Sequence, residues 1–345
     1  MIPRLEHVDA ERVKRLTREL GADLVGIADA AVLNENPPDP AVPQTPERIS
    51  PHCRSVVVIA CRIPVAAFRA KSNVAVQYMD MVVLRRMDRI AHLVSEALER
   101  AGHPAFATAA QETDWDYKRA SYGRLSTRHL GVEAGLGTLG LDVNILTPEF
   151  GPRVYLTGVL TEAVLEPDPI RPEQVCIGES CSRCLHACPA DAVGHWGLRK
   201  AACATCAQEF GYMTATDFFA DFARRPAAEQ RTRLTGRQLF GFWQGLLRVV
   251  GSFGDCPRCL AVCPVGADYS HLAAPQRAIP ERTEEKVARG RAQAEARRRG
   301  AEVPGLSERN IRWVGPAGYR GGSVSGRKRE ANAATSRRPS EPGRR

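Results

Sequence analysis

Residues 176–189 read CIGESCSRCLHACP, and this stretch decides how the chain is interpreted. Its four cysteines follow the spacing Cys-x4-Cys-x2-Cys-x3-Cys-Pro. A second stretch, residues 256–264, reads CPRCLAVCP and repeats the Cys-x2-Cys-x3-Cys-Pro ending. Of the 11 cysteines in the chain, nine lie between residues 176 and 263. Clustered cysteines at short, repeated spacings are typical of metal sites.

The repeated Cys-Pro ending is close to the tandem pattern of bacterial ferredoxins. In that pattern three closely spaced thiolates hold one 4Fe-4S cluster, and the cysteine before proline binds the other cluster. The predicted ligands of one cluster are Cys176, Cys181, Cys184 and Cys263, and those of the other are Cys188, Cys203, Cys256 and Cys259. Cys206 is then the spare cysteine, although Cys203 and Cys206 can exchange roles.

Other interpretations of the cysteines stay open at this point. Zinc also binds paired Cys-x2-Cys motifs, but the Cys-x3-Cys-Pro ending that occurs twice favours iron-sulfur. The spacing of the first three cysteines alone matches plant-type 2Fe-2S proteins, which leaves the second stretch unexplained. Cys53 and Cys61 lie beside or within an apolar run, so we expect them to be core residues.

The first 172 residues predict a mixed α/β (α+β) domain. Asp9 is placed to cap a helix that Gly21 ends, and a second helix is expected over 84–98. Apolar runs predict strands at 24–28, 56–61, 143–146 and 154–159. The polar and aromatic residues 111–128 suit a loop that lines a site.

Two further units are expected after this domain. Residues 173–272 form the cysteine-rich domain, with helices expected over 207–223 and 237–250. Residues 273–345 form a basic, mostly disordered tail, because residues 271–345 carry 18 basic and 8 acidic side chains. Within the tail a charged helix is expected over 284–299, and residues 310–322 carry apolar side chains that can dock on the body: Ile311, Trp313, Val314 and Tyr319.

Composition excludes several classes of protein. With 345 residues, 43% of them hydrophobic, the chain is long and apolar enough to bury a core, which excludes disorder throughout. No apolar run approaches the roughly 20 residues of a membrane span. Residues 1–20 show neither a signal-peptide pattern nor a twin-arginine motif. We therefore expect a cytoplasmic protein that does not bind membranes.

Residues 135–140, GLGTLG, fit the dinucleotide-binding fingerprint in letters alone. That fingerprint follows a strand and opens a helix. Here residues 127–133 predict a helix before the glycines, and a strand follows them. The order of elements therefore argues against binding of NAD.

The residues around these glycines carry a family resemblance. Residues 128–140 (RHLGVEAGLGTLG), then Asn144, 146–148 (LTP), 151–153 (GPR) and 158–161 (GVLT), are followed by tandem ferredoxin motifs. This order resembles the epoxyqueuosine reductase and reductive dehalogenase superfamily over roughly residues 10–270. The resemblance implies a nitroreductase-like α/β domain with base-off cobalamin and a ferredoxin-like domain with two 4Fe-4S clusters. It also implies a cofactor-binding role for Gly135, Leu136, Gly137, Gly140 and Asn144.

The chain departs from epoxyqueuosine reductases at two places. Where they carry an acidic proton donor in an Asp-x-x-Pro segment, this chain reads SYGR at 121–124. About fifty residues separate Cys203 from Cys256, which is longer than the family pattern. Candidate proton donors near this position are Tyr122, Tyr117, Lys118 and Asp116, and Arg128 or Arg124 can hold an anionic group of a substrate.

Three functions remain in view. The main hypothesis is an iron-sulfur oxidoreductase that delivers electrons through its clusters to cobalamin and reduces a small organic substrate, with an external electron donor such as ferredoxin or flavodoxin. The alternative is an electron-transfer or maturation protein without cobalamin. A tRNA-modifying activity of the epoxyqueuosine reductase type, or RNA contact by the basic tail, is the third, and no interleaving of basic and aromatic residues predicts a dedicated RNA surface.

Overall fold

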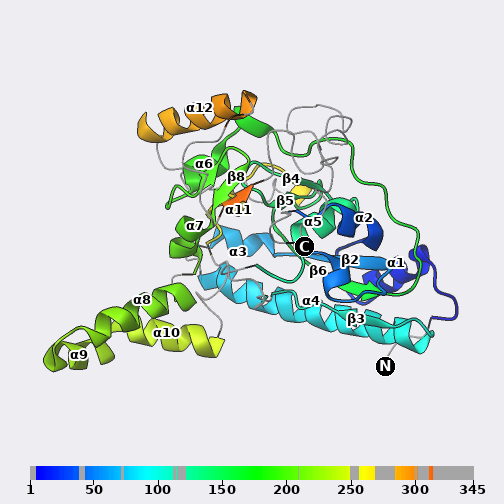
Figure 1. The fold of residues 1–345 in the computed structure, drawn as a ribbon, viewed down its shortest axis with the longest axis horizontal. Helices are drawn as coiled ribbons and strands as arrows, with labels where there is room; N and C mark the ends of the chain where they lie inside the picture. The colour runs from blue at the N-terminus through cyan, green and yellow to red at the C-terminus, as the bar shows by residue number, and fades with distance from the viewer. Residues whose placement is uncertain are drawn as a thin grey trace, which may run out of the picture.

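The computed structural model describes residues 5–38, 43–70, 74–111, 114, 122–208, 210–248, 256–268, 284–299, 301 and 311–313. These residues combine helices with a sheet, so the expected mixed α/β class is confirmed. Figure 1 shows a body built around the sheet and three helices that project from one side of it.

The central sheet has four antiparallel strands in the order β1-β2-β6-β3. Its strands are β1 (Leu24–Asp29), β2 (Ser55–Arg62), β3 (Ala105–Ala107) and β6 (Val154–Thr161). Every residue of β2 except Arg62 is buried, because helices cover both faces of the sheet. This double burial explains why the strand reads as a continuous apolar run instead of an alternating one.

Helices pack on the two faces of this sheet. The helices of this domain are α1 (Ala10–Glu19), α2 (Ala30–Glu35), η1 (Pro46–Arg48), α3 (Val65–Arg69), α4 (Val74–Arg100) and α5 (Thr127–Glu133). α1 and α4 share one core with Val57 and Ile59 of β2, and α2 and α5 share the other core with Val56 and Val58. Asp9 caps α1 as expected, since its side chain accepts a hydrogen bond of 2.8 Å from the backbone N of Arg12.

The strand expected over 143–146 is shorter in the structure. Only β5 (Ile145–Leu146) forms, and it pairs with β4 (Thr138–Leu139). Val143 has a φ of 62° and its backbone N donates to the Gly140 oxygen, so it belongs to the turn of this hairpin. The helix α5 precedes the glycines, and β4 lies between Gly137 and Gly140, so among the described residues no strand leads into the segment and no helix follows it, although a dinucleotide site requires both.

The cysteine-rich part consists of short elements. They are η2 (Gly178–Ser180), α6 (Arg183–Ala187), β7 (Val193–Gly194), β8 (Gly197–Arg199), α7 (Lys200–Ala207) and α11 (Arg258–Val262). β9 (Ile311–Trp313) pairs with β8, so these three residues attach to this part. The charged helix expected in the tail is α12 (Glu284–Arg298). Val314 and Tyr319 lie outside the described residues.

Three helices form the insertion between the cysteines, which we call the lobe. They are α8 (Tyr212–Ala223), α9 (Ala227–Leu234) and α10 (Arg237–Arg248). The helix expected over 207–223 is present as α8 but starts later, at Tyr212, because α7 ends at Ala207 and Gly211 stands in extended conformation before α8. The short helix α9 was not expected from the sequence.

Candidate iron-sulfur centre

The two cysteine motifs fold in the same way. In each motif a five-residue helix, α6 or α11, carries the middle cysteine, and the last cysteine follows the helix in extended conformation. The helix stops there because the proline after the last cysteine disfavours helical backbone at the residue before it. α6 and α11 pack against each other, so segments more than seventy residues apart bring their cysteines to one place.

Electrostatic interactions between thiols show how the cysteines group. The pKa of Cys263 is raised to about 12, mainly by burial, with Asp142 and Cys176 as further causes. Burial raises the pKa of Cys184 well above its usual value, and the negative charges of its neighbours, Cys176 and Cys263 among them, raise it further. Burial also raises the pKa of Cys176, which interacts with Cys181. These four thiols are the predicted ligands of the first cluster.

A second group lies beside the first. The pKa of Cys203 is raised to about 11, first by burial and then by the charges of Cys188, Cys256 and Cys206. The pKa of Cys259 is raised well above its usual value by burial, and Cys203, Cys256 and Cys188 act in the same direction. Cys206 therefore belongs to the same neighbourhood, but it is exposed whereas Cys203 is half-buried.

This donor set fits iron-sulfur clusters. Most of the thiols are half-buried or buried beside other thiols, so ionising several of them together is costly without a positive partner, a charge that bound iron would supply. Backbone amides already point at two sulfur atoms: the Gly178 amide donates to Cys176 Sγ over 3.4 Å and the Ala192 amide to Cys188 Sγ over 3.1 Å. Hydrogen bonds of this kind tune cluster potentials. Within the described part of the chain, no three His, Cys, Asp or Glu side chains are close enough to hold a single metal ion.

Asp142 and Arg128 lie at the junction of the two groups. Burial raises the pKa of Asp142, and its charge acts on Cys184 and Cys263 of the first group and on Cys259 of the second. Burial lowers the pKa of Arg128, and the charges of Asp142, Cys203 and Cys259 oppose this shift. Arg128, expected to hold a substrate anion, is thus an electrostatic neighbour of the second thiol group, although part of its surface remains accessible.

Arg153 joins the α/β domain to the second cysteine motif. This fully buried side chain pairs with Asp268 through two nitrogens. It also donates to the backbone oxygens of Leu260, Cys263 and Val265, over 3.2, 3.0 and 2.7 Å. Arg153 therefore fixes the loop that carries Cys263. Its role was not expected from the sequence, in which Arg153 appeared only as the last residue of the GPR segment at 151–153.

The glycine-rich segment packs against its own chain. A Cβ atom at Gly137 would lie 2.1 Å from the backbone oxygen of Leu146, and one at Gly135 would lie 2.4 Å from that of Pro169. A Cβ atom at Gly140 would meet the side chain of Leu146 at 2.4 Å. Internal packing accounts for these three glycines, and the approach of their amides to a corrin stays a prediction.

The other predicted cofactor residues also have internal partners. Leu136 is buried in the core beneath α5. The Asn144 side chain donates to Asp142 over 3.0 Å and lies 3.9 Å from Cys259 Sγ. Asn144 therefore contacts the second thiol group, so its described contacts favour a role beside the clusters.

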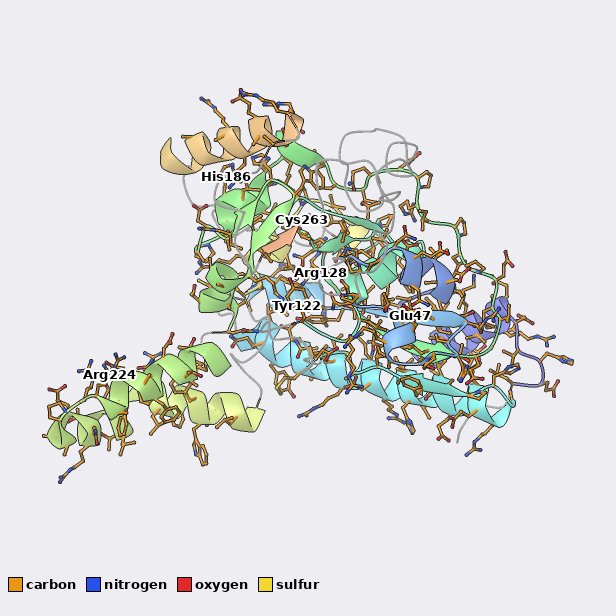
Figure 2. The ribbon with its side chains drawn as sticks, in the orientation of Figure 1. Glu47, Tyr122, Arg128, His186, Arg224 and Cys263 are labelled. Atoms are coloured by element: carbon orange, nitrogen blue, oxygen red, sulfur yellow. The ribbon has the colours of Figure 1, made fainter. Side chains whose placement is uncertain are left out.

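Of the candidate proton donors, the structure describes only Tyr122. Its side chain is buried, and the Lys200 ammonium lies 3.8 Å from the centre of its ring. Because Lys200 begins α7, this contact links Tyr122 to the helix of Cys203. Figure 2 shows Tyr122, Arg128 and Cys263 in the central part of the molecule. Tyr117, Lys118 and Asp116 lie outside the described residues, and Arg124 is exposed.

Comparisons with known proteins give sequence relatives that are reductases. The epoxyqueuosine reductase of Bacillus subtilis is 26% identical over 292 residues, 79% of this chain and 67% of that protein. The tetrachloroethene reductive dehalogenase of Dehalobacter restrictus is 28% identical over 145 residues, 41% of this chain and 24% of that protein. The epoxyqueuosine reductase of Listeria monocytogenes is 29% identical over 143 residues, 30% of its length. No family model matches the chain.

Solved structures of both kinds of enzyme are also similar. An epoxyqueuosine reductase with an epoxyqueuosine-modified tRNA-Tyr stem loop matches with a TM-score of 0.44 and 21% identity, over 89% of this chain and 78% of that one. A reductive dehalogenase whose structure suggests a mechanism for B12-dependent dehalogenation matches with a TM-score of 0.42 and 22% identity, over 53% of this chain and 25% of that one.

The sequence relatives define the class of the protein, which is that of the reductases. More narrowly, the chain is a homologue of the epoxyqueuosine reductases and the reductive dehalogenases, which confirms the predicted resemblance. It spans about two thirds of the length of the Bacillus subtilis relative and less than a third of the other two. Within the described residues, no helix has both the length and the apolar character needed to cross a membrane.

Proposed function

We propose that the chain is a reductase in which two 4Fe-4S clusters deliver low-potential electrons to a base-off cobalamin that reduces a small organic substrate. The observation that carries the proposal is the packing of α6 against α11, which brings the thiols of the two cysteine motifs together, and the electrostatic interactions among those thiols agree with it. The clusters transfer single electrons, and bound cobalamin supplies a low-valent cobalt centre.

Residues between the two groups support the passage of electrons from one to the other. Asp142 acts electrostatically on both groups, and the charge of Cys259 of the second group raises the pKa of Cys184 of the first. The thiol groups are therefore direct neighbours, as a chain of electron carriers requires. Arg128 places a positive charge beside the second group, where it favours the more negative, reduced cluster.

Tyr122 is the described residue that best suits proton transfer. A neutral phenol can donate a proton without bringing negative charge to a reduced centre beforehand. The Lys200 ammonium over its ring favours the negative charge that remains after the proton leaves. Tyr117 remains a second candidate from the sequence.

A second function, electron transfer without cobalamin, is favoured by the glycine-rich segment. The space next to Gly135 and Gly137 is filled by the protein's own backbone, so these glycines need no cofactor to explain them. A tRNA substrate would follow from the epoxyqueuosine reductase relatives. A cytoplasmic location agrees with each of these functions and is part of the proposal.

One experiment separates the candidates. Protein reconstituted without oxygen is analysed for iron, then by absorbance and EPR spectroscopy before and after hydroxocobalamin is added. We expect about eight irons per chain, four for each cluster, and a retained base-off cobalt signal. Eight irons without retained cobalamin would favour the electron carrier. A colourless protein loaded with zinc would contradict both.

A further inference from the structure

The lobe formed by α8, α9 and α10 presents apolar side chains to solvent. The most exposed are Phe240, Trp243 and Leu246 of α10, at 62%, 60% and 77% of their full accessible surface. Each of these residues lies three positions after the one before it, so neighbouring members of the series lie next to each other on the helix surface. Arg237 precedes them with the same spacing and is exposed as well. Aromatic and arginine side chains together are enriched in protein interfaces.

The lobe does not need these outer side chains to hold itself together. Its inner face has a separate aromatic core, in which the ring of Phe242 lies 5.3 Å from that of Phe218 and 5.8 Å from that of Phe210. Phe242 and Phe218 are buried. The exposed side chains on the outer face of α10 are therefore available to a partner.

The charge of the lobe indicates the kind of partner. Arg225 pairs with Asp221 and Glu229, and Arg233 pairs with Asp221, so these charges are largely compensated. Arg231 and Arg237 are exposed and make no ion pair with any residue that the structure describes. Apolar side chains beside uncompensated cations suit a partner whose surface is acidic around an apolar centre.

The attachment of the lobe indicates what the partner does. Four residues separate the end of α7, which carries Cys203 and Cys206, from the start of α8, and seven residues separate the end of α10 from Cys256. Both ends of the lobe are thus joined to cysteines of the second group, and Cys206 of that group is exposed. Figure 2 shows Arg224 on the lobe, well away from the centre of the molecule.

We infer that the lobe is the docking surface for a small acidic one-electron carrier protein, which passes its electron to the cluster of the second cysteine group. This inference rests on the proposed iron-sulfur function and assigns the electron donor to a surface. The carrier is oxidised by one electron and the cluster is reduced by one. No bond is formed or broken in this step.

The test compares two reductants on the reconstituted full-length protein. A reduced acidic plant-type ferredoxin serves as the protein donor, and dithionite serves as the small donor that needs no docking surface. Two double variants are used, Trp243→Ala/Leu246→Ala and Arg231→Glu/Arg237→Glu. We expect reduction by ferredoxin to slow at least about tenfold in each variant, while reduction by dithionite stays unchanged. The wild-type rate with ferredoxin should also fall as salt is added.

Matched controls lie on the α/β domain. Val164, which is 78% exposed, is replaced by alanine, and the exposed pair Arg85 and Arg89 of α4 is replaced by glutamate. These variants should react with ferredoxin like the wild type. Full iron content with unchanged ferredoxin rates in the lobe variants would overturn the inference. Loss of a dimer or of binding to an RNA stem loop in these variants, with unchanged ferredoxin rates, would overturn it too. Absence of iron from the wild type would instead contradict the proposed function.

Discussion

The cysteine motifs and the glycine-rich segment look equally functional in the sequence, but the structure treats them differently. Most of the cysteines end up half-buried or buried beside one another, and burial together with the charges of neighbouring groups raises the pKa of Cys184 and Cys259. The glycines at 135 and 137 end up against backbone oxygens of Pro169 and Leu146. The cysteines therefore call for a positively charged group from outside the chain, whereas the glycine-rich segment packs against the chain itself.

This difference gives a criterion for a ligand site in this molecule. A residue pattern that leaves buried polar groups without compensation requires something from outside, because such burial is costly. A pattern that the fold itself satisfies gives no such indication. By this criterion the cysteines call for a positively charged group from outside the chain, and iron is the group that we propose, whereas cobalamin rests on the family resemblance.

The largest effect, on iron content, is expected from replacing a single ligand cysteine of the second group. Cys188→Ser should remove one cluster and leave about four irons per chain, whereas Cys206→Ser should leave about eight. Cys188 interacts with both Cys203 and Cys259, whereas Cys206 is exposed at the edge of the group. Iron analysis of both variants after reconstitution gives the answer. Equal iron loss in the two variants would contradict the ligand assignment.

A large effect on the free energy of unfolding is expected at the buried ion pair of Arg153 and Asp268, which supports the loop of Cys263. Arg153→Met leaves Asp268 buried without its cation and frees three backbone oxygens around Cys263. Breaking a buried pair costs about 3–5 kcal/mol of unfolding free energy. Urea unfolding of the apoprotein measures this loss. Because the loop of Cys263 is released, iron bound by the first group should also fall, and unchanged iron and stability would show that Arg153 does not fix this loop.

Gly137→Ala tests whether internal packing accounts for the glycine-rich segment. The new methyl group would lie 2.1 Å from the Leu146 oxygen, so the hairpin must shift. We expect a loss of about 1–3 kcal/mol in the unfolding free energy of the protein without any cofactor. Gly236→Ala is the control, because its nearest neighbour would lie 3.2 Å away. An apoprotein of unchanged stability that no longer retains cobalamin would reverse our view of this segment.

Much of this comparison could be made from the sequence, for physical reasons that differ between elements. Helix α1 follows from Asp9 and an apolar face, and β2 follows from a run of buried side chains, because these signals are local. The grouping of the cysteines was also accessible, since the repeated spacing limits which thiols can meet. The sequence does not show which residues that are far apart in the chain pack against each other in the fold.

Three examples show this limit. The contact of Gly135 with Pro169 joins residues that are far apart in the chain, so the glycines looked available to a ligand. Arg153 stands in the sequence as the last residue of the GPR segment, but in the fold it connects the start of strand β6 of the sheet to Asp268, more than a hundred residues away. Similarly, Arg128 was expected at a substrate, but its electrostatic neighbours are thiols from two later segments.

The smallest effect is expected from replacing Arg128, and it concerns the reduction potential of the second cysteine group. If its charge serves the second cluster, Arg128→Gln removes a cation that favours the reduced state, and the midpoint potential of that cluster should fall by on the order of tens of millivolts. Arg128→Lys keeps the charge and should stay close to the wild type. A redox titration followed by EPR measures both variants, with the first cluster as the internal reference. If both variants keep the wild-type potential but lose substrate reduction, Arg128 binds the substrate, as the resemblance alone would suggest.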